Sequence, residues 1–480
     1  MLHSGQRSRP PMLGAALLLL LHATAARLAT PPRAVPLLPR IPPPRAQLEP
    51  PPRAAPPPPT GDLLGATALV AGTTIGAGII ALPAKTIGAG FAPSAAALVL
   101  AWAYMAASAL LIAEVNVNTL CALDKKAVSI DSMAEETLGP AGAKLSGLAY
   151  VFIHYALLVA YMLQGGSLLF ELAPIAPLPA ALAAPAFAAL AGGFLLFSPQ
   201  RVVERVNSLL VGGVLLSFVA LLATGVPQVD LQLLAHADAP QVVPAVPVIV
   251  LALVFHNVVP TVSAQLGCDL PRIRQAILVG SAIPTLMFIA WSAVILGSVP
   301  PDAALSAAAA GEQFDPLVAL RSAGDALGQE VAIFSLLAVV TSFIGFVYGL
   351  VDFWSDALGW DEREDLPEGA APAERPLREK AALYGLTLLP PLAVAEWDPS
   401  LFFAALDNAG TYGILILFGI IPAAMAWQQR YSTGPGTVEL VAPEALPGGR
   451  ASLALMALAA ASVIGVETFE RLQSFVPLLA

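Results

Sequence analysis

Eleven apolar segments, separated mostly by short polar connections, follow one another along the chain. A helix needs about 20 residues to cross the hydrocarbon core of a bilayer, and most of these segments reach that length. The fourth and the ninth are shorter. The segments are residues 63–83, 93–116, 145–172, 180–197, 206–226, 244–266, 275–298, 330–354, 380–395, 401–427 and 451–469. This pattern predicts an all-α membrane protein with about 11 transmembrane helices.

The composition indicates the same class of protein. Of the 480 residues, 57% are hydrophobic and only 12% are charged, whereas soluble domains carry about 25% charged residues. The chain after residue 60 has no basic patch, so we expect a lipid bilayer as its partner and no nucleic acid. The two cysteines, Cys121 and Cys268, have neither the number nor the spacing of a disulfide framework or a metal site.

The positions of lysine and arginine predict the orientation of the helices. If residue 61 starts on the cytosolic or stromal side, the outer connections carry only Lys85, Arg321 and Arg471. The inner connections carry thirteen basic residues: Lys125, Lys126, Lys144, Arg201, Arg205, Arg272, Arg274, Arg363, Arg375, Arg378, Lys380, Arg430 and Arg450. Basic residues concentrate on the inner side of membrane proteins. A missed or invented helix would scramble this bias, so it supports 11 spans as well as the orientation.

Residues 1–60 differ from the rest of the chain and are predicted to be a disordered targeting leader. Two arginines, a short apolar run and a stretch of small residues come first, which is the pattern of a secretory signal peptide. Residues 31–60 then contain 14 prolines and four arginines, with Glu49 as the only acid. That composition is typical of a Pro-rich linker or of a transit peptide. We interpret both parts together as a leader for the inner envelope of a plastid, with the plasma membrane or another endomembrane as the alternative.

The first apolar segment contains an unusual cluster of glycines. Gly72, Gly76 and Gly78 lie within seven positions, and Pro83 closes the segment. Glycine costs about 1 kcal/mol relative to alanine in a helix interior. Unwound backbone is tolerated in a membrane only where it lines a polar cavity, as in the discontinuous helices of many transporters. The alternative is a small-residue packing face, because Gly72 and Gly76 have the Gly-x-x-x-Gly spacing.

The sixth apolar segment has a matching interruption. The sequence Phe255-His-Asn-Val-Val-Pro260 places polar residues and a proline inside an apolar run. Paired breaks in the two halves of a chain are typical of inverted repeats around a transport site. We therefore predict a transporter domain over residues 61–480, with repeats at about 62–226 and 244–427 and an extra helix at about 451–469. The paired breaks therefore favour a transport site, and not a small-residue packing face, at the first break.

Several motifs resemble the tryptophan/tyrosine permease family. They are Gly72–Pro83, Phe255–Pro260 with Gly280–Pro284, Thr341–Gly345 with Asp352-Phe353, and Ala405–Gly410 with Phe418–Pro422. The resemblance covers essentially residues 62–470, with the motifs in order. It implies a LeuT-type fold of two inverted five-helix repeats with discontinuous helices 1 and 6. It also implies that the protein is a symporter, which carries an aromatic amino acid together with a cation, and not an enzyme. The alternative is an amino-acid sensor or a channel-like protein on the same scaffold.

The fifth apolar segment departs from the family pattern. Bacterial members typically carry a lysine there, whereas residues 207–214 of this chain contain none. A buried ammonium group can replace a bound cation or carry a proton. Its absence puts proton symport in doubt, so both Na⁺ and H⁺ are kept as coupling ions. Beyond this monovalent cation we expect no metal and no cofactor.

The resemblance places the substrate at the two breaks. The first break is expected to bind the carboxylate through free backbone amides, since glycine allows a close approach and the following half-helix adds its dipole. The second break is expected to receive the ammonium group and to shape the side-chain pocket. The third span borders the substrate in this fold. The predicted substrate-binding residues are Thr73, Thr74, Ile75, Gly76, Ala77, Gly78, Tyr155, Phe255, His256 and Asn257.

A cation site is predicted beside the substrate. Thr341 and Ser342 are adjacent hydroxyl residues in an apolar span, and they would form a cage of oxygen ligands with the carbonyl groups of Gly72, Ile75 and Ala338. Residues at these positions hold sodium in related LeuT-type folds. The alternative is that each hydroxyl bonds to its own helix, which is a common and inert arrangement.

Ionisable residues inside membrane spans are functional candidates by default, because burying them is costly. They are Glu114, His154, His256, Asp352, Asp407 and Glu467. His256 lies in the broken segment and is the preferred titratable candidate, whereas His154 is as readily a packing residue. We predict that Asp407 pairs with Lys85 and closes the outer side of the transporter. An enzyme or a metal site finds no support, because the histidines do not cluster.

Overall fold

The computed structural model describes residues 61–76, 78–123, 128–172, 179–302, 306, 314–322, 326–360, 375–432 and 440–475. The predicted leader, residues 1–60, lies outside this part of the chain. The described helices belong to a single unit, Pro56–Ala480. Within the described residues the structure is all-helical and has no β-strand, which confirms the predicted all-α class.

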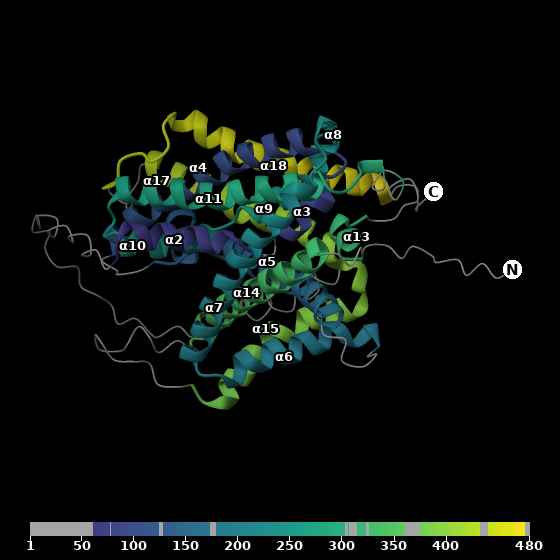
Figure 1. The fold of residues 1–480 in the computed structure, drawn as a ribbon. Helices are drawn as coiled ribbons and strands as arrows, with labels where there is room; N and C mark the ends of the chain where they lie inside the picture. Colours follow the sequence, from purple (N-terminus) through teal and green to yellow (C-terminus); the bar gives the residue numbers. More distant parts are fainter. Residues whose placement is uncertain are drawn as a thin grey trace, which may run out of the picture. The chain divides into compact units, whose positions relative to one another are not determined.

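The helices keep the order of the apolar segments (Figure 1). They are α2 (Leu63–Thr74), α3 (Gly78–Thr86), α4 (Phe91–Leu123), α5 (Ile130–Leu172), α6 (Ala183–Phe197), α7 (Gln200–Gly225), α8 (Leu231–Leu234), α9 (Val246–Ala252), α10 (Val259–Gln265), α11 (Leu270–Leu296), α13 (Pro316–Ser322), α14 (Ala326–Ala357), α15 (Leu377–Trp397), α16 (Phe402–Asn408), α17 (Ile421–Tyr431) and α18 (Gly449–Phe475). Short 3₁₀ turns are η1 (Ala180–Leu182), η2 (Val226–Gln228), η3 (Ala239–Ala245), η4 (His256–Val258) and η6 (Pro399–Leu401), and η7 (Ala409–Ile420) is a π-helix.

Among the described residues, eight helical stretches are long and apolar enough to cross a membrane, and the bent pair α2–α3 would be a ninth span. The protein is therefore a multi-pass membrane protein. The other two predicted spans are also helical, but α6 has only 15 residues, and α15 contains Pro390 and Pro391. A helix thus occupies each of the 11 predicted segments, while the number of 11 crossings stays a prediction.

The first span is broken in its middle. α2 ends at Thr74, and α3 begins at Gly78 with a bend of 52° between the two helices. Ile75, which follows α2, has an extended backbone (φ −74°, ψ 95°). This confirms the discontinuous first helix that the glycine cluster predicts.

The sixth span is broken as well. α9 ends at Ala252, residues 253–255 form no helix, and the single turn η4 leads into α10. Pro260 occupies the first turn of α10, where its missing N–H group leaves no helical bond unmade. The second predicted break is therefore confirmed. The inverted relation of the two halves stays a prediction.

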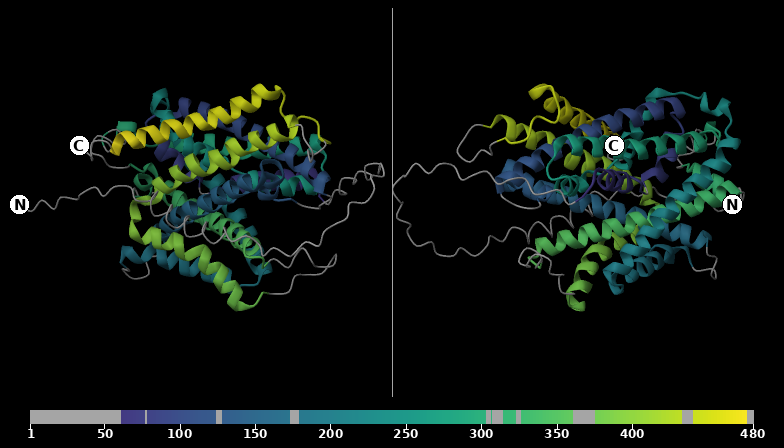
Figure 2. Two further views of the ribbon diagram at one scale, coloured as in Figure 1. Left: turned by 180° about the vertical axis from the view of Figure 1, so that it is seen from behind. Right: turned by 60° about the vertical axis from the view of Figure 1, so that its left-hand side comes forward.

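Two groups of helices meet at α5. The first contains α2, α3, α4, α9, α10, α11, η7, α16 and α17, and the second contains α6, α7, α14 and α15. α11 packs along α2 and α4 on one side, and α14 packs along α7 on the other. α5 contacts α6, α14 and α15 of the second group as well as η7, α16 and α17 of the first (Figures 1 and 2). The two broken spans lie in the first group, so α5 and α14 form the surface that faces them.

A buried ion pair joins α4 to α17. Both ε-oxygens of Glu114 accept hydrogen bonds from the Arg430 guanidinium, at 2.7 and 2.6 Å, and the two side chains are only 2% and 1% exposed. The amide of Ala445 also donates to Glu114, at 2.7 Å. Such a bidentate contact is among the strongest that a carboxylate makes in a protein. Glu114, a functional candidate from the sequence, thus anchors the segment that leads into α18.

Candidate substrate cavity

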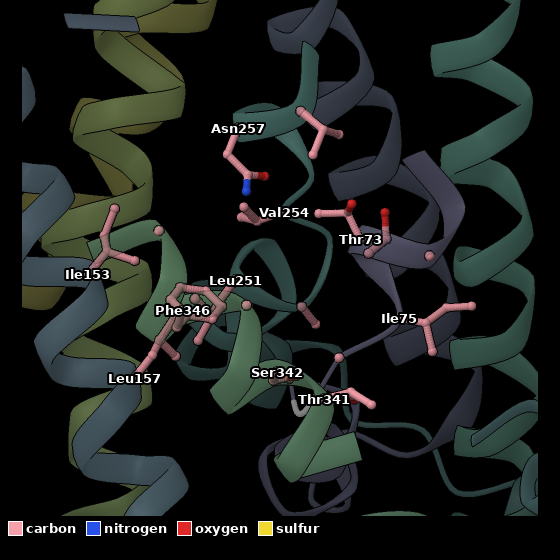
Figure 3. A pocket seen from close by; sticks show the side chains of 18 of the residues that line it. Thr73, Ile75, Ile153, Leu157, Leu251, Val254, Asn257, Thr341, Ser342 and Phe346 are labelled. Atoms are coloured by element: carbon pink, nitrogen blue, oxygen red, sulfur yellow. The ribbon is translucent and has the colours of Figure 1, made fainter. Parts of the chain in front are cut away.

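A cavity of about 430 Å³ opens beside the break in the first span. Its size falls within the range of small-molecule sites, about 300–1,000 Å³. It is lined by residues of α2, α3, α5, α7, α9, α14 and η7, and by the chain between α9 and α10. Figure 3 shows Ile153 and Leu157 of α5 on one side and Thr73 and Ile75 on the other. The cavity therefore lies where both broken spans face α5 and α14.

The segment predicted to bind the carboxylate forms one wall of this cavity. Residues 72–76 and Gly78 line it, and Ala77 lies outside the described residues. The first amide groups of a helix have no partner within that helix and lie at the positive end of its dipole. α3 begins at Gly78, which lines the cavity, while the next amide, that of Ile79, donates to the carbonyl oxygen of Gly76 at 3.3 Å. This geometry suits a carboxylate.

The threonine side chains of the break are already used within α2. The hydroxyls of Thr73 and Thr74 donate to the carbonyl oxygens of Leu69 and Val70, each at 2.8 Å. A hydroxyl has one hydrogen to donate, so neither side chain offers a further donor to a ligand. The donors for an anion at this wall are consequently backbone amides.

The three glycines of the break have different surroundings. A methyl group on Gly72 would meet nothing within 4 Å, because that position faces the open cavity. On Gly76 it would lie 2.8 Å from the hydroxyl oxygen of Ser342, and on Gly78 it would lie 2.8 Å from the backbone of Ala252. Gly78 therefore allows α3 to pack closely on α9. Gly76 brings the break against α14.

The second broken span contributes less of the predicted site than expected. Asn257 lines the cavity, and its side chain points into it (Figure 3). Phe255 and His256 are both buried and do not line it. The His256 ring lies between Phe255 and Phe418, with ring centroids 4.9 and 4.7 Å away. Phe418 itself lines the cavity, so it separates His256 from the space where a ligand would lie.

An aromatic wall of the cavity lies on α5 and α14. It consists of Tyr150, His154 and Tyr161 of α5 and Phe346 of α14, all of which line the cavity. The ring centroid of His154 lies 4.0 Å from that of Tyr150 and 4.9 Å from that of Phe346, with the ring planes tilted. The Tyr161 ring meets the Phe346 ring edge-on, with 5.6 Å between the centroids. Such a wall provides both apolar area and ring edges for an aromatic ligand.

Tyr155, the tyrosine of α5 predicted to bind the substrate, lies outside this wall. Tyr155 does not line the cavity, because its hydroxyl points toward α15 and donates to the carbonyl oxygen of Leu386 at 2.8 Å. The lining positions 150, 154, 157 and 161 are spaced as one face of a helix. Tyr155 follows His154 directly and is turned by about 100° from that face. The helical spacing of the two other tyrosines was the signal that could have found them.

The predicted cation ligands lie together only in part. Thr341 and Ser342 line the cavity next to the break, whereas Ala338 is buried and does not line it. The Thr341 hydroxyl donates to the carbonyl oxygens of Leu337 and Ala338, at 3.0 and 3.1 Å. This is the local bonding expected of an inert threonine. Its oxygen nevertheless retains lone pairs, which are what a cation needs.

The predicted outer ion pair is present. The Lys85 ammonium lies 2.5 Å from a carboxylate oxygen of Asp407, and each side chain is 20% exposed. Lys85 also lies over the Phe403 ring, at 5.6 Å. Arg471 of α18 donates to Asn408, the residue after Asp407. The pair thus joins α3 to α16 at the end of α3 that is remote from the break, and its role as a gate stays a prediction.

Comparison with known proteins identifies the family. The sequence profile of the tryptophan/tyrosine permease family matches residues 60–466, which include every lining residue of the cavity. The chain belongs to this family. The resemblance expected from the motifs at both breaks is therefore confirmed.

Characterised relatives of this protein include bacterial transport proteins. It is 30% identical over 374 residues to the tyrosine-specific transport system 2 of Haemophilus influenzae, covering 76% of this chain and 87% of the relative. It is 29% identical to the tryptophan-specific transport protein of Pseudomonas aeruginosa, covering 78% and 87%. The low affinity tryptophan permease of Escherichia coli is 26% identical, covering 75% and 86%.

Two glycine variants should separate packing from binding at the break. Gly78→Ala should lower the thermal stability, by about 1–3 kcal/mol of unfolding free energy, because its methyl group overlaps the backbone of Ala252. Gly72→Ala should keep the stability and weaken substrate binding by about tenfold, because the added methyl group occupies the cavity. Thermal unfolding and ligand binding of the purified permease measure both effects.

Gly193→Ala is the matched control, since a methyl group there also meets nothing within 4 Å and the residue lies in α6, away from the cavity. Wild-type stability of Gly78→Ala would contradict the packing role of Gly78. Unchanged binding by Gly72→Ala would contradict the position of the ligand.

Proposed function

We propose that this permease is a secondary active transporter that moves tyrosine or tryptophan across a membrane by cation-coupled alternating access. One observation carries the proposal: a single cavity is lined by the break of the first span, where α3 begins, and by aromatic side chains of α5 and α14. An aromatic amino acid has a carboxylate at one end and a ring at the other. Its two ends match the two walls.

The ammonium group of such a substrate also has acceptors in the cavity. The last carbonyl groups of α2 lack partners within the helix and lie at the negative end of its dipole. Asn257 adds a side-chain oxygen from the other broken span. A zwitterion placed at the break therefore meets the positive end of α3 with its carboxylate and the negative end of α2 with its ammonium group. This supports an amino acid in preference to a simple anion or amine.

The relatives support the same substrate class and a transport function in place of an enzymatic one. Each of those described above is named as a transport protein or permease for tyrosine or tryptophan. The chain covers more than four-fifths of the length of each. We therefore extend transport of an aromatic amino acid to this protein.

We propose sodium as the coupling ion. Ser342 and Thr341 bring two hydroxyl oxygens to the break, beside the carbonyl groups at the end of α2. On α7, where bacterial members typically carry a lysine, the cavity is lined by Asn207 and Val211, neither of which carries a charge. A proton remains the competing ion, but His256 lies behind Phe418 and would reach the substrate only after a rearrangement.

We also propose that Lys85 and Asp407 close the outer side. Their contact joins a half of the broken first span to α16, so the two must separate before the cavity opens at that end. The leader composition supports a plastid envelope as the location, with the plasma membrane or another endomembrane as the alternative. Import of residues 1–60 fused to a fluorescent reporter would distinguish these locations.

Uptake by the purified permease in proteoliposomes tests the proposed function. Radiolabelled tyrosine or tryptophan should accumulate with saturation kinetics when a cation gradient is imposed. Phe346→Ala should lower the apparent affinity by about tenfold, because it removes an aromatic contact and apolar area from the wall. Phe197→Ala, on the exposed surface of α6, is the control and should leave uptake unchanged. Binding without uptake would indicate a sensor, and an uncoupled ionic current would indicate a channel.

The coupling ion is tested in the same vesicles. At fixed pH, an inward sodium gradient should raise the rate of uptake, and Thr341→Val with Ser342→Ala should raise the sodium concentration needed for half the effect. The double variant removes two oxygen ligands while keeping the size of the side chains. Full accumulation driven by a pH gradient in sodium-free medium, lost in His256→Gln, would instead establish proton coupling.

The outer ion pair is tested by exchanging its charges. Lys85→Asp or Asp407→Lys alone should impair uptake, since each places two like charges in contact. The double exchange should recover part of the uptake, because opposite charges again face each other. If the double variant is no better than the single variants, the closing role of the pair is wrong.

A further inference from the structure

His154 has a fixed orientation in the aromatic wall. Its ring lies between Tyr150 and Phe346 and is 7% exposed. Its Nδ1 atom is 2.7 Å from the backbone carbonyl oxygen of Tyr150, one turn earlier in α5. A carbonyl oxygen can only accept a hydrogen bond, so Nδ1 must carry the hydrogen.

The other ring nitrogen is consequently an acceptor. In a neutral imidazole with its hydrogen on Nδ1, Nε2 offers a lone pair. The ring is neutral because a buried charge requires a paired counter-charge, and no carboxylate of the described residues bonds to it. No described residue donates a hydrogen bond to Nε2 either.

Gly349 keeps the approach to this acceptor open. A methyl group at Gly349 would lie 3.0 Å from Nε2 of His154 and 2.9 Å from the hydroxyl oxygen of Tyr150. All three residues line the cavity. The space that a side chain at position 349 would fill therefore connects the acceptor with the ligand site.

We propose that Nε2 of His154 accepts a hydrogen bond from the polar hydrogen on the substrate's ring, the phenol O–H of tyrosine or the indole N–H of tryptophan. His154 then selects these two amino acids over phenylalanine. The inference rests on the proposed function, because it assumes an aromatic amino acid in this cavity.

The arrangement of the cavity walls brings the edge of the substrate's ring to Nε2 of His154. The carboxylate and the ammonium group belong at the break of the first span. Ile153 and Leu157 of α5, whose lining face also carries His154, lie across the cavity from Thr73 and Ile75 (Figure 3). A side chain extended away from the break reaches the aromatic wall with its far edge. A ring without a donor would leave the buried acceptor unpaired, which is costly, whereas a ring with an N–H or O–H group satisfies it.

Substrate analogues test the proposal on the unmodified protein. Competition against radiolabelled tryptophan in detergent compares tryptophan with 3-benzothienylalanine, which has the same shape but a sulfur atom in place of the N–H group. Tyrosine is compared with phenylalanine in the same way. We expect each donor-bearing amino acid to bind at least about tenfold more tightly than its partner.

Two variants assign this preference to His154. His154→Phe keeps a ring between Tyr150 and Phe346 but removes the acceptor, so the ratio between tryptophan and benzothienylalanine should fall to about one while both still bind. Gly349→Ala should reduce the same ratio, because its methyl group fills the approach to Nε2. Gly193→Ala in α6 is the control and should keep the wild-type ratio.

The outcomes are distinct. A ratio near one in the wild-type protein, or a wild-type ratio in both His154→Phe and Gly349→Ala, would overturn the role of His154 and leave aromatic amino-acid transport intact. If His154→Phe does not fold, the wild-type analogue ratio and Gly349→Ala decide the matter. If no aromatic amino acid binds the wild-type protein, the proposed function fails, and the inference fails with it.

Discussion

Backbone groups in hydrocarbon must find partners, and this requirement governs where the helices of this protein can break. An unwound segment facing lipid would leave several N–H and C=O groups unpaired, at a cost of several kcal/mol for each. Both breaks occur where the chain borders a cavity and packs against other helices. Gly78 lies against the backbone of Ala252, so the broken spans support each other at the point where each loses regular helix. The cavity and the breaks depend on one another.

The same requirement gives the site its chemistry. The backbone at the two helix ends supplies the recognition elements of the cavity, the amide end of α3 and the carbonyl end of α2. Their dipoles are fixed by the helices, so they need no reorganisation when a zwitterion arrives. α5 supplies side chains from across the cavity and α14 supplies them from beside the first break, in both cases at helical spacing. Polar recognition thus comes from the backbone, and recognition of the side chain comes from aromatic residues.

The sequence predicted the helix breaks, which depend on local residues. It did not predict which side chains of a helix face the cavity, because that depends on the rotation of the helix about its axis. The glycine cluster and the Phe255–Pro260 interruption predicted both breaks, because they disfavour a continuous helix in any environment. The Lys85–Asp407 contact joins residues 322 positions apart and was anticipated from the resemblance to the fold, not from a local pattern. Tyr155 was predicted to bind the substrate, whereas Tyr150 and Tyr161 line the cavity; packing sets the rotation of α5 about its axis, which the sequence does not show. His256 was expected in the cavity, but the non-helical turn after α9 directs its ring behind Phe418.

The buried contact between Glu114 and Arg430 has a consequence for the biogenesis of the protein. The two residues are 316 positions apart, and a chain made at about 5–20 residues per second needs about 16 to 63 s to extend from one to the other. A chain that enters the bilayer from its N-terminal side brings in the acid long before the base. During that interval α4 has a carboxylate without its counter-ion, which is costly inside the bilayer. The final position of α4 is thus set only when α17 arrives, so the scaffold around the cavity is completed by nearly the last helix synthesised.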